Sequence, residues 1–145
     1  MSAWGVEAFA NDVALDEATW LTQPGAVVDC AERGLILLAS QNLVSEEMAN
    51  TAYAAVEMIA ASLAPEPYWQ DDHTTLFDRD SLPYLPPVIT RWLKTRPFFT
   101  LGEIELALDV TRLLRRPELL ALWQEPVERE TALSETEHRL LAHIS

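Results

Sequence analysis

Residues 45–63 read SEEMANTAYAAVEMIAASL, and this stretch decides the fold. Ser45 carries its hydroxyl where a helix start is capped, and the two glutamates after it suit the positive end of a helix. Apolar residues then recur at three- and four-residue spacing, at Met48, Ala52, Ala55, Val56, Ile59 and Leu63. The many alanines let a neighbouring helix approach closely. The stretch therefore predicts the central helix of an all-helical protein.

Two helices are expected before this central one. The first covers residues 13–21, ends before Pro24 and buries Leu15 and Trp20. The second covers residues 26–41, and its predicted buried stripe holds Val27, Cys30, Ala31, Gly34, Leu35, Leu38 and Ala39. A glycine inside a helix costs about 1 kcal/mol relative to alanine. Gly34 therefore marks either a kink or a close crossing of two helices.

Start signals for further helices follow in the second half of the chain. A proline at a first turn or a hydroxyl residue followed three positions later by glutamate is typical of a helix start. Such signals predict helices over residues 88–94, 101–114 and 117–124, and from Ser134 onward. No stretch predicts a sheet. We expect an all-α fold, a single compact domain over residues 1–145 with six or seven helices.

Residues 64–87 interrupt this pattern. Five prolines predict a connector in place of a long helix, and the aromatic and leucine residues among them predict a loop packed on the body of the protein. Long ordered loops often carry function. The candidate partner-binding residues are one aromatic side chain and four acids of this loop, namely Trp69, Asp71, Asp72, Asp78 and Asp80.

The N-terminus carries an aromatic motif. Trp4 and Phe9 are large apolar anchors, and Asn11 and Asp12 precede apolar residues where a helix cap is expected. With Gly5, Ala14 and Asp16, this stretch resembles a bacterial family of unknown function whose members open with W-G-x-x-x-F-x-N-D-x-A-x-D. The alanine-rich stretch at residues 52–61 is similar to the second landmark helix of that family. The resemblance implies a compact, mostly helical bacterial protein and no assigned activity.

The charge of the chain limits its partners. Ten basic and 23 acidic residues give a net charge of -13, and the acids dominate residues 1–84. Such a field repels nucleic-acid phosphate and anionic lipid and attracts cationic surfaces. The same acidity also serves simple solubility. Six cationic residues over 85–117 are expected to pair with the acidic half within or between subunits, namely Arg91, Lys94, Arg96, Arg112, Arg115 and Arg116.

The motifs of common enzymes are missing from the sequence. There is no glycine-rich phosphate loop and no nucleophile elbow, and His138 and His143 stand on different faces of a helix. Cys30, the single cysteine, is expected in the core and suits a reducing cytoplasm. We therefore expect no catalytic residues, no cofactor and no resident metal. An acidic loop with His73 keeps a metal site as an alternative.

Three functional hypotheses follow from these observations. The leading one is a non-catalytic bacterial protein-binding module, such as an immunity or antitoxin-like inhibitor whose acidic surface binds a basic protein. The alternative is a small-molecule or metal-binding protein that uses residues 68–84. The third is a homo-oligomer in which acidic and basic segments meet across a two-fold axis. Neither nucleic acid nor a membrane is expected as a partner.

Overall fold

The computed structural model describes residues 18–40, 45–65, 85–123 and 125–144. These residues form α2 (Ala26–Ala39), α3 (Glu46–Ser62), α4 (Pro87–Leu93), α5 (Leu101–Leu114), α6 (Pro117–Leu120) and α7 (Pro126–Ile144). A helical turn at residues 18–21 precedes α2, and no strand occurs in the described ranges. The all-α prediction is confirmed. The whole N-terminal motif and most of the proline-rich loop lie outside the described residues.

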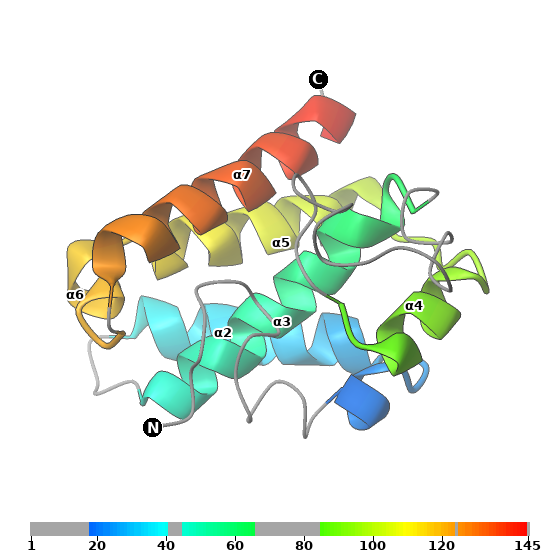
Figure 1. Ribbon diagram of the computed structural model, residues 1–145, viewed down its shortest axis with the longest axis horizontal. Helices are drawn as coiled ribbons and strands as arrows, with labels where there is room; N and C mark the ends of the chain where they lie inside the picture. Colours follow the sequence, from blue (N-terminus) through cyan, green and yellow to red (C-terminus); the bar gives the residue numbers. More distant parts are fainter. Residues whose placement is uncertain (1–17, 41–44, 66–84, 124, 145) are drawn as a thin grey trace.

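Helix α3 is the centre of the fold (Figure 1). Its N-cap is the predicted one, because the Ser45 side chain accepts a hydrogen bond from the backbone N–H of Met48. Helices α2, α5, α7 and α4 all pack against it. Every residue from Ala52 to Ala61 is buried, so the helix is covered on all sides. The sequence predicted only a one-sided stripe, because periodicity does not register alanines and a tyrosine that face other helices.

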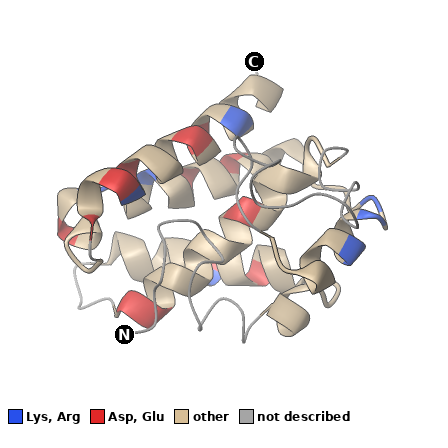
Figure 2. Ribbon diagram, viewed as in Figure 1, with Lys and Arg blue, Asp and Glu red and all other residues tan. Residues whose placement is uncertain are grey.

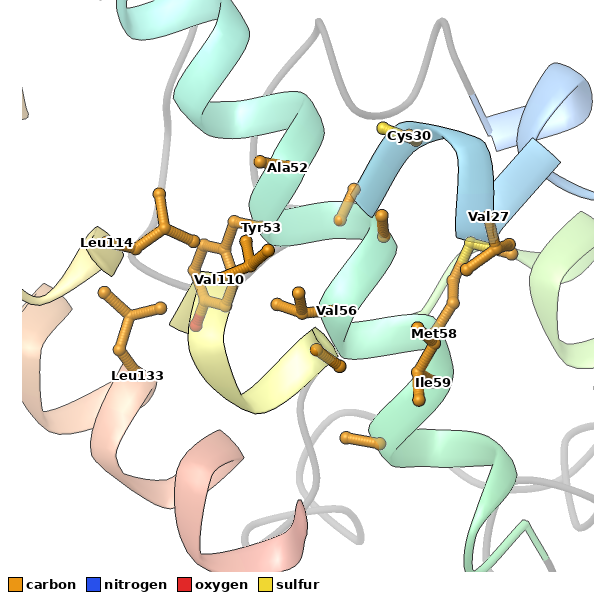
Figure 3. Close-up of a cluster of buried hydrophobic side chains, with 14 of the residues drawn as sticks. Val27, Cys30, Ala52, Tyr53, Val56, Met58, Ile59, Val110, Leu114 and Leu133 are labelled. Carbon is orange, nitrogen blue, oxygen red and sulfur yellow. The ribbon is translucent and has the colours of Figure 1, made fainter. Parts of the chain in front are cut away.

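The helices around α3 form a continuous wall. Helix α2 packs beside α5, and α5 packs beside α7. The short helix α6 lies between α5 and α7 in the sequence and connects them. The core lies between this wall and α3. Figure 3 shows the Tyr53 ring beside Val110, Leu114 and Leu133, which come from α5 and α7.

Gly34 marks a close crossing of α2 and α3. A Cβ atom added to Gly34 would lie 3.1 Å from the Cβ of Ala52 and 3.9 Å from a methyl group of Val110. Three helices therefore meet at this point, and α2 continues through it without interruption. Of the two predicted explanations, the close crossing is confirmed. The burial of α2 follows the prediction except at Leu35, which is half-buried, and Ala39, which is exposed.

The predicted start of α5 is confirmed, and that of α7 is wrong. Thr100 and Glu103 form the expected reciprocal capping box. Ser134, by contrast, lies in the middle of α7, which begins at Pro126. A proline fits the first turn because its missing N–H would have no helical partner there. The Glu137 carboxylate does not fold back toward Ser134, because it accepts hydrogen bonds from arginines of α5.

Helix α6 is also shorter than predicted. It ends at Leu120 instead of about residue 124, and the backbone N–H groups of Leu122 and Trp123 bond to carbonyls only three residues earlier. This tight turn directs the Trp123 side chain into the interior, where its ring is buried. The α4 prediction is confirmed, since α4 covers Pro87–Leu93.

Candidate protein-interaction surface

All five predicted partner-binding residues, Trp69, Asp71, Asp72, Asp78 and Asp80, lie outside the described residues, as does His73 of the alternative metal site. A candidate site is therefore built from the described helices. Figure 2 marks their acidic residues in red along the ribbon, and several of these residues are exposed.

Helix α2 carries exposed acids on the side turned away from α3. Gly34 points toward Ala52 of α3, and the helical repeat places Asp29, Glu32 and Ile36 on the opposite side of α2. All three are exposed, and the Ile36 side chain is 70% accessible to solvent. This stripe therefore consists of the carboxylates of Asp29 and Glu32 and the solvent-exposed apolar side chain of Ile36.

Helix α5 carries a second acidic stripe. Glu105 and Asp109 are exposed and stand four residues apart, opposite the buried residue Ala107. Helices α2 and α5 run side by side in the same direction, because residues at the start of both line one cavity and Gly34 lies beside Val110 further along. The acids of α2 and α5 therefore lie at similar positions along the two parallel helix axes. We call Asp29, Glu32, Glu105 and Asp109 the acidic α2–α5 face.

The described arginines form their ion pairs elsewhere. Arg112 and Arg115 both bind the carboxylate of Glu137, and Arg115 also binds Glu130 at 2.6 Å. Within the described ranges, no cationic group is within 4.0 Å of a carboxylate of the acidic α2–α5 face. Within the chain, the predicted pairing with the acidic half is therefore wrong for Arg112 and Arg115, while pairing between subunits stays a prediction. Their partners are acids of α7, because α5 and α7 pack side by side.

These ion pairs control the charge of Glu137. Burial of the Glu137 carboxyl opposes ionisation, but the hydrogen bond from Arg112 and the charge of Arg115 outweigh it. They hold the pKa of Glu137 below its ordinary value of 4.5. The carboxylate therefore stays charged at neutral pH and ties α5 to α7.

A polar seam joins α3 to α7 inside the protein. The buried Glu57 carboxylate accepts two hydrogen bonds from Arg139, both at 2.7 Å, and one from the Thr136 hydroxyl at 3.1 Å. Further along α3, the Asn50 side-chain oxygen accepts a 2.7 Å hydrogen bond from the indole N–H of Trp123. These contacts attach α7 and the connection that precedes it to α3.

Two further buried groups belong to this seam. The Arg129 guanidinium lies 4.7 Å from the centre of the Trp123 ring, and burial lowers its pKa. Burial also raises the pKa of the Tyr53 hydroxyl above its ordinary value of 10.0. Sequence reasoning did not identify this seam. Its signal was the spacing of Asn50, Tyr53 and Glu57 along one face of an otherwise apolar helix.

An apolar groove borders the acidic α2–α5 face. Its volume is about 340 Å³, and it lies between residues 18–21, α2 and α3. Its walls include Trp20, Leu37 and Met48, and its rim includes Arg33 and Glu47. Trp20 was predicted to be buried, but it is 40% exposed because it stands at the edge of this groove while its neighbour Leu21 enters the core.

Cys30 also lines the groove. It is a buried thiol outside any disulfide, and its Sγ donates to the Thr51 carbonyl at 3.6 Å, so the predicted core position is confirmed. A second cavity of about 420 Å³ lies where α2 begins, beside the connection from α4 to α5. Trp92 and Phe99 are in ring contact there, and Phe98 is 84% exposed.

Within the described part of the chain, no three histidine, cysteine or acidic side chains gather as metal ligands would. His138 and His143 are both exposed on α7. No described helix has the length and apolar character needed to cross a membrane.

Comparison with known proteins gives one match. A family model described as "Domain of unknown function (DUF4259)" matches residues 2–135. Neither a curated protein nor a solved structure matches the chain. The match covers α2 to α6 and the first part of α7, and therefore both the acidic α2–α5 face and the groove.

Proposed function

The chain belongs to the DUF4259 family, a domain of unknown function, and we propose that it is a non-catalytic protein-binding module whose acidic α2–α5 face binds a cationic protein. The observation that carries the proposal is the set of four exposed carboxylates on two parallel helices. A partner's lysines and arginines would supply the countercharges that no described residue provides. Complementary charge of this kind speeds association and selects the partner.

The shape of the face supports this proposal. Both acidic stripes lie on helices that are packed against α3 and each other, so the carboxylates stand on a rigid base. A rigid surface orders few groups on binding and so loses little conformational entropy. Ile36 adds an exposed apolar side chain among the acids, which suits a protein partner better than a free cation.

The finer form of the proposal is an inhibitor of the immunity or antitoxin type in a bacterial cytoplasm. Such a protein covers the cationic active surface of a toxic enzyme, for example a nuclease. The support is the net charge of -13 on a 145-residue chain, together with exposed acids on a helical scaffold.

The test uses three charge-reversal variants of the full chain. The face variant changes Glu32, Glu105 and Asp109 to lysine. The control variant changes three exposed acids of α6 and α7 to lysine, namely Glu118, Glu128 and Glu135. Both alter the net charge equally, so a difference between them reports position. The third variant changes the loop acids Asp71, Asp72, Asp78 and Asp80 to lysine and tests the loop as the contact.

Each protein is used at low salt to recover partners from an extract of the source organism, after circular dichroism has shown that it is folded. We expect the parent and the control variant to retain the same basic protein and the face variant to lose it. Affinity for the purified partner should then fall by about 100-fold or more in the face variant only. If the face and control variants lose the partner to the same extent, binding depends on net charge alone, and the proposal of a specific face is wrong. Loss in the loop variant alone would move the contact to the loop.

A further inference from the structure

The groove between residues 18–21, α2 and α3 lies directly beside the acidic α2–α5 face. Asp29, Arg33 and Leu37 follow one another at four-residue spacing on α2, so they stand in one row along the helix. Arg33 and Leu37 line the groove, and Asp29 begins the row on the acidic face. A partner that covers the acids of α2 therefore also reaches the groove.

The walls of the groove are apolar and partly bare. Trp20 is 40% exposed and Leu37 is 38% exposed, and Met48 lines the groove between them with its flexible thioether. Large apolar side chains left half-exposed around a hollow are typical of a binding site. Gly34 and Ala52 form the floor, because the close crossing of α2 and α3 leaves no large side chain there to fill the space.

The size of the groove limits what enters it. Its volume of about 340 Å³ stands at the small end of the roughly 300–1,000 Å³ range of small-molecule sites. One large side chain of a partner fits a hollow of this size, and protein interfaces concentrate their binding energy in such buried anchors. An aromatic or leucine side chain is therefore the matching occupant.

The charges around the groove select the partner. Glu47 lies on the rim, and Asp29 stands one turn before Arg33 on α2. Against these two acids the rim carries one cation, Arg33. The surroundings of the hollow are therefore net acidic, and an apolar anchor flanked by cationic residues is favoured over one flanked by acids.

From these observations we infer that the groove receives one large apolar side chain from a basic amphipathic segment of the protein partner, whose cations face Asp29 and Glu47. The inference rests on the proposed function and adds the anchor to it. Binding through the acidic face and through the groove would thus be two parts of one interface, the first supplying steering and the second supplying a slow dissociation.

The test uses three synthetic 14-residue peptides as probes. The first is an amphipathic lysine and leucine helix, the second replaces its leucines with alanine, and the third replaces its lysines with glutamate. The full-length protein is labelled with 5-fluorotryptophan, and Trp20→Phe assigns the fluorine resonance of Trp20. We expect the lysine–leucine peptide to shift that resonance and to bind about 10-fold more tightly than the lysine–alanine peptide. The glutamate–leucine peptide should not bind.

Two truncation variants, one inside the groove and one far from it, complete the test. Leu37→Ala removes a wall of the groove and should weaken the lysine–leucine peptide by about 10-fold. Val127→Ala truncates an exposed side chain of α7 that does not line the groove and should change the affinity by less than about twofold. Circular dichroism of both variants checks that they fold.

The outcomes separate the two proposals. If the leucine and alanine peptides bind equally and Trp20 does not respond, the groove inference fails while the acidic face stands. If neither lysine peptide binds, or the glutamate peptide binds as well as they do, both proposals fail. A Trp20 resonance that moves with protein concentration alone would assign the groove to a second copy, and one that moves in Trp4→Ala or Phe9→Ala would assign it to the chain's own N-terminus. Either result would overturn the inference.

Discussion

Single residues decide how the last helix is attached to the centre of the fold. Glu57 is the charged residue among the buried residues of α3, and its carboxylate accepts hydrogen bonds from the partly exposed Arg139 guanidinium and the buried Thr136 hydroxyl. A buried ion pair is strongly destabilised when only one partner is removed, because the other keeps an uncompensated charge. The pair therefore makes the position of α7 on α3 sensitive to a single side chain.

Glu57→Gln is expected to lower the free energy of unfolding by about 2 kcal/mol. The amide keeps the shape of the side chain but leaves Arg139 without its counterion. Urea unfolding followed by circular dichroism measures the change. Glu105→Gln on the exposed face of α5 is the control and should stay within about 0.5 kcal/mol. A Glu57→Gln variant as stable as this control would contradict a structural role for the pair.

Glu137 gives the protein an expected dependence on acid. Because its arginine partners hold the folded-state pKa below 4.5, the stabilisation is present above that pH and is lost as the pH falls through the folded-state pKa. The free energy of unfolding should therefore fall below about pH 4.5 more steeply in the parent than in Glu137→Gln. At neutral pH the variant should be less stable by about 1 kcal/mol, since both arginines are partly exposed.

Urea titrations from about pH 7 down to about pH 3 measure both proteins. The difference in stability between them should shrink as the pH falls. A difference that stays constant over the whole range would assign the contribution of Glu137 to packing instead of charge.

At the scale of elements, the crossing of α2 and α3 depends on small residues. Gly34 lets the helices approach until its position lies almost against the Ala52 side chain. The contact joins two helix backbones, so no flexible side chain is available to move aside. This crossing places Gly34 and Ala52 at the floor of the groove. It also fixes the position of α2 and therefore of the acids that α2 carries.

Gly34→Ala and Gly102→Ala are expected to act in opposite directions. A new Cβ at residue 34 would meet the Ala52 Cβ at 3.1 Å, and the overpacking should outweigh the better helix propensity by about 1 kcal/mol. At residue 102 the nearest atom is the Thr100 hydroxyl at 3.9 Å, so the propensity gain of roughly 0.5 kcal/mol should remain. Thermal unfolding of both variants measures the signs. Stabilisation by Gly34→Ala would show that the crossing is looser than described.

At the scale of the whole molecule, charge and packing oppose each other. A net charge of -13 on 145 residues produces self-repulsion that favours expansion. The core that resists it is continuous from α2 through α3 to α7. The described ion pairs lie on the α3, α5 and α7 side, while the acidic α2–α5 face has none among the described residues.

Added salt is therefore expected to stabilise the protein. Raising sodium chloride from about 0.02 M to about 0.3 M should increase the Tm by about 3 °C, because screening weakens repulsion among exposed carboxylates. Differential scanning calorimetry measures the change. A variant with Asp29, Glu32, Glu105 and Asp109 changed to the corresponding amides should respond less. A Tm that falls with salt would show that attraction within the ion pairs dominates the field.

The sequence by itself determined the local structure. Ser45 and the Thr100–Glu103 capping box predicted where α3 and α5 begin, because caps act within one turn of chain. The α7 start was missed, because the sequence at Ser134 matches a capping box whose glutamate is used by arginines of another helix. A capping rule considers only residues within one helical turn. It therefore does not predict that arginines distant in sequence bind the glutamate instead.

Only the tertiary structure decided the candidate site. The acidic α2–α5 face exists because two helices separated by more than 60 residues lie in parallel, and the groove exists because α2 and α3 cross at two small residues. The partial exposure of Trp20 and the burial of Glu57 could not be predicted from the sequence either, since burial depends on which elements pack together. Short-range periodicity specifies what one helix buries, whereas juxtaposition arises from contacts between distant parts of the chain.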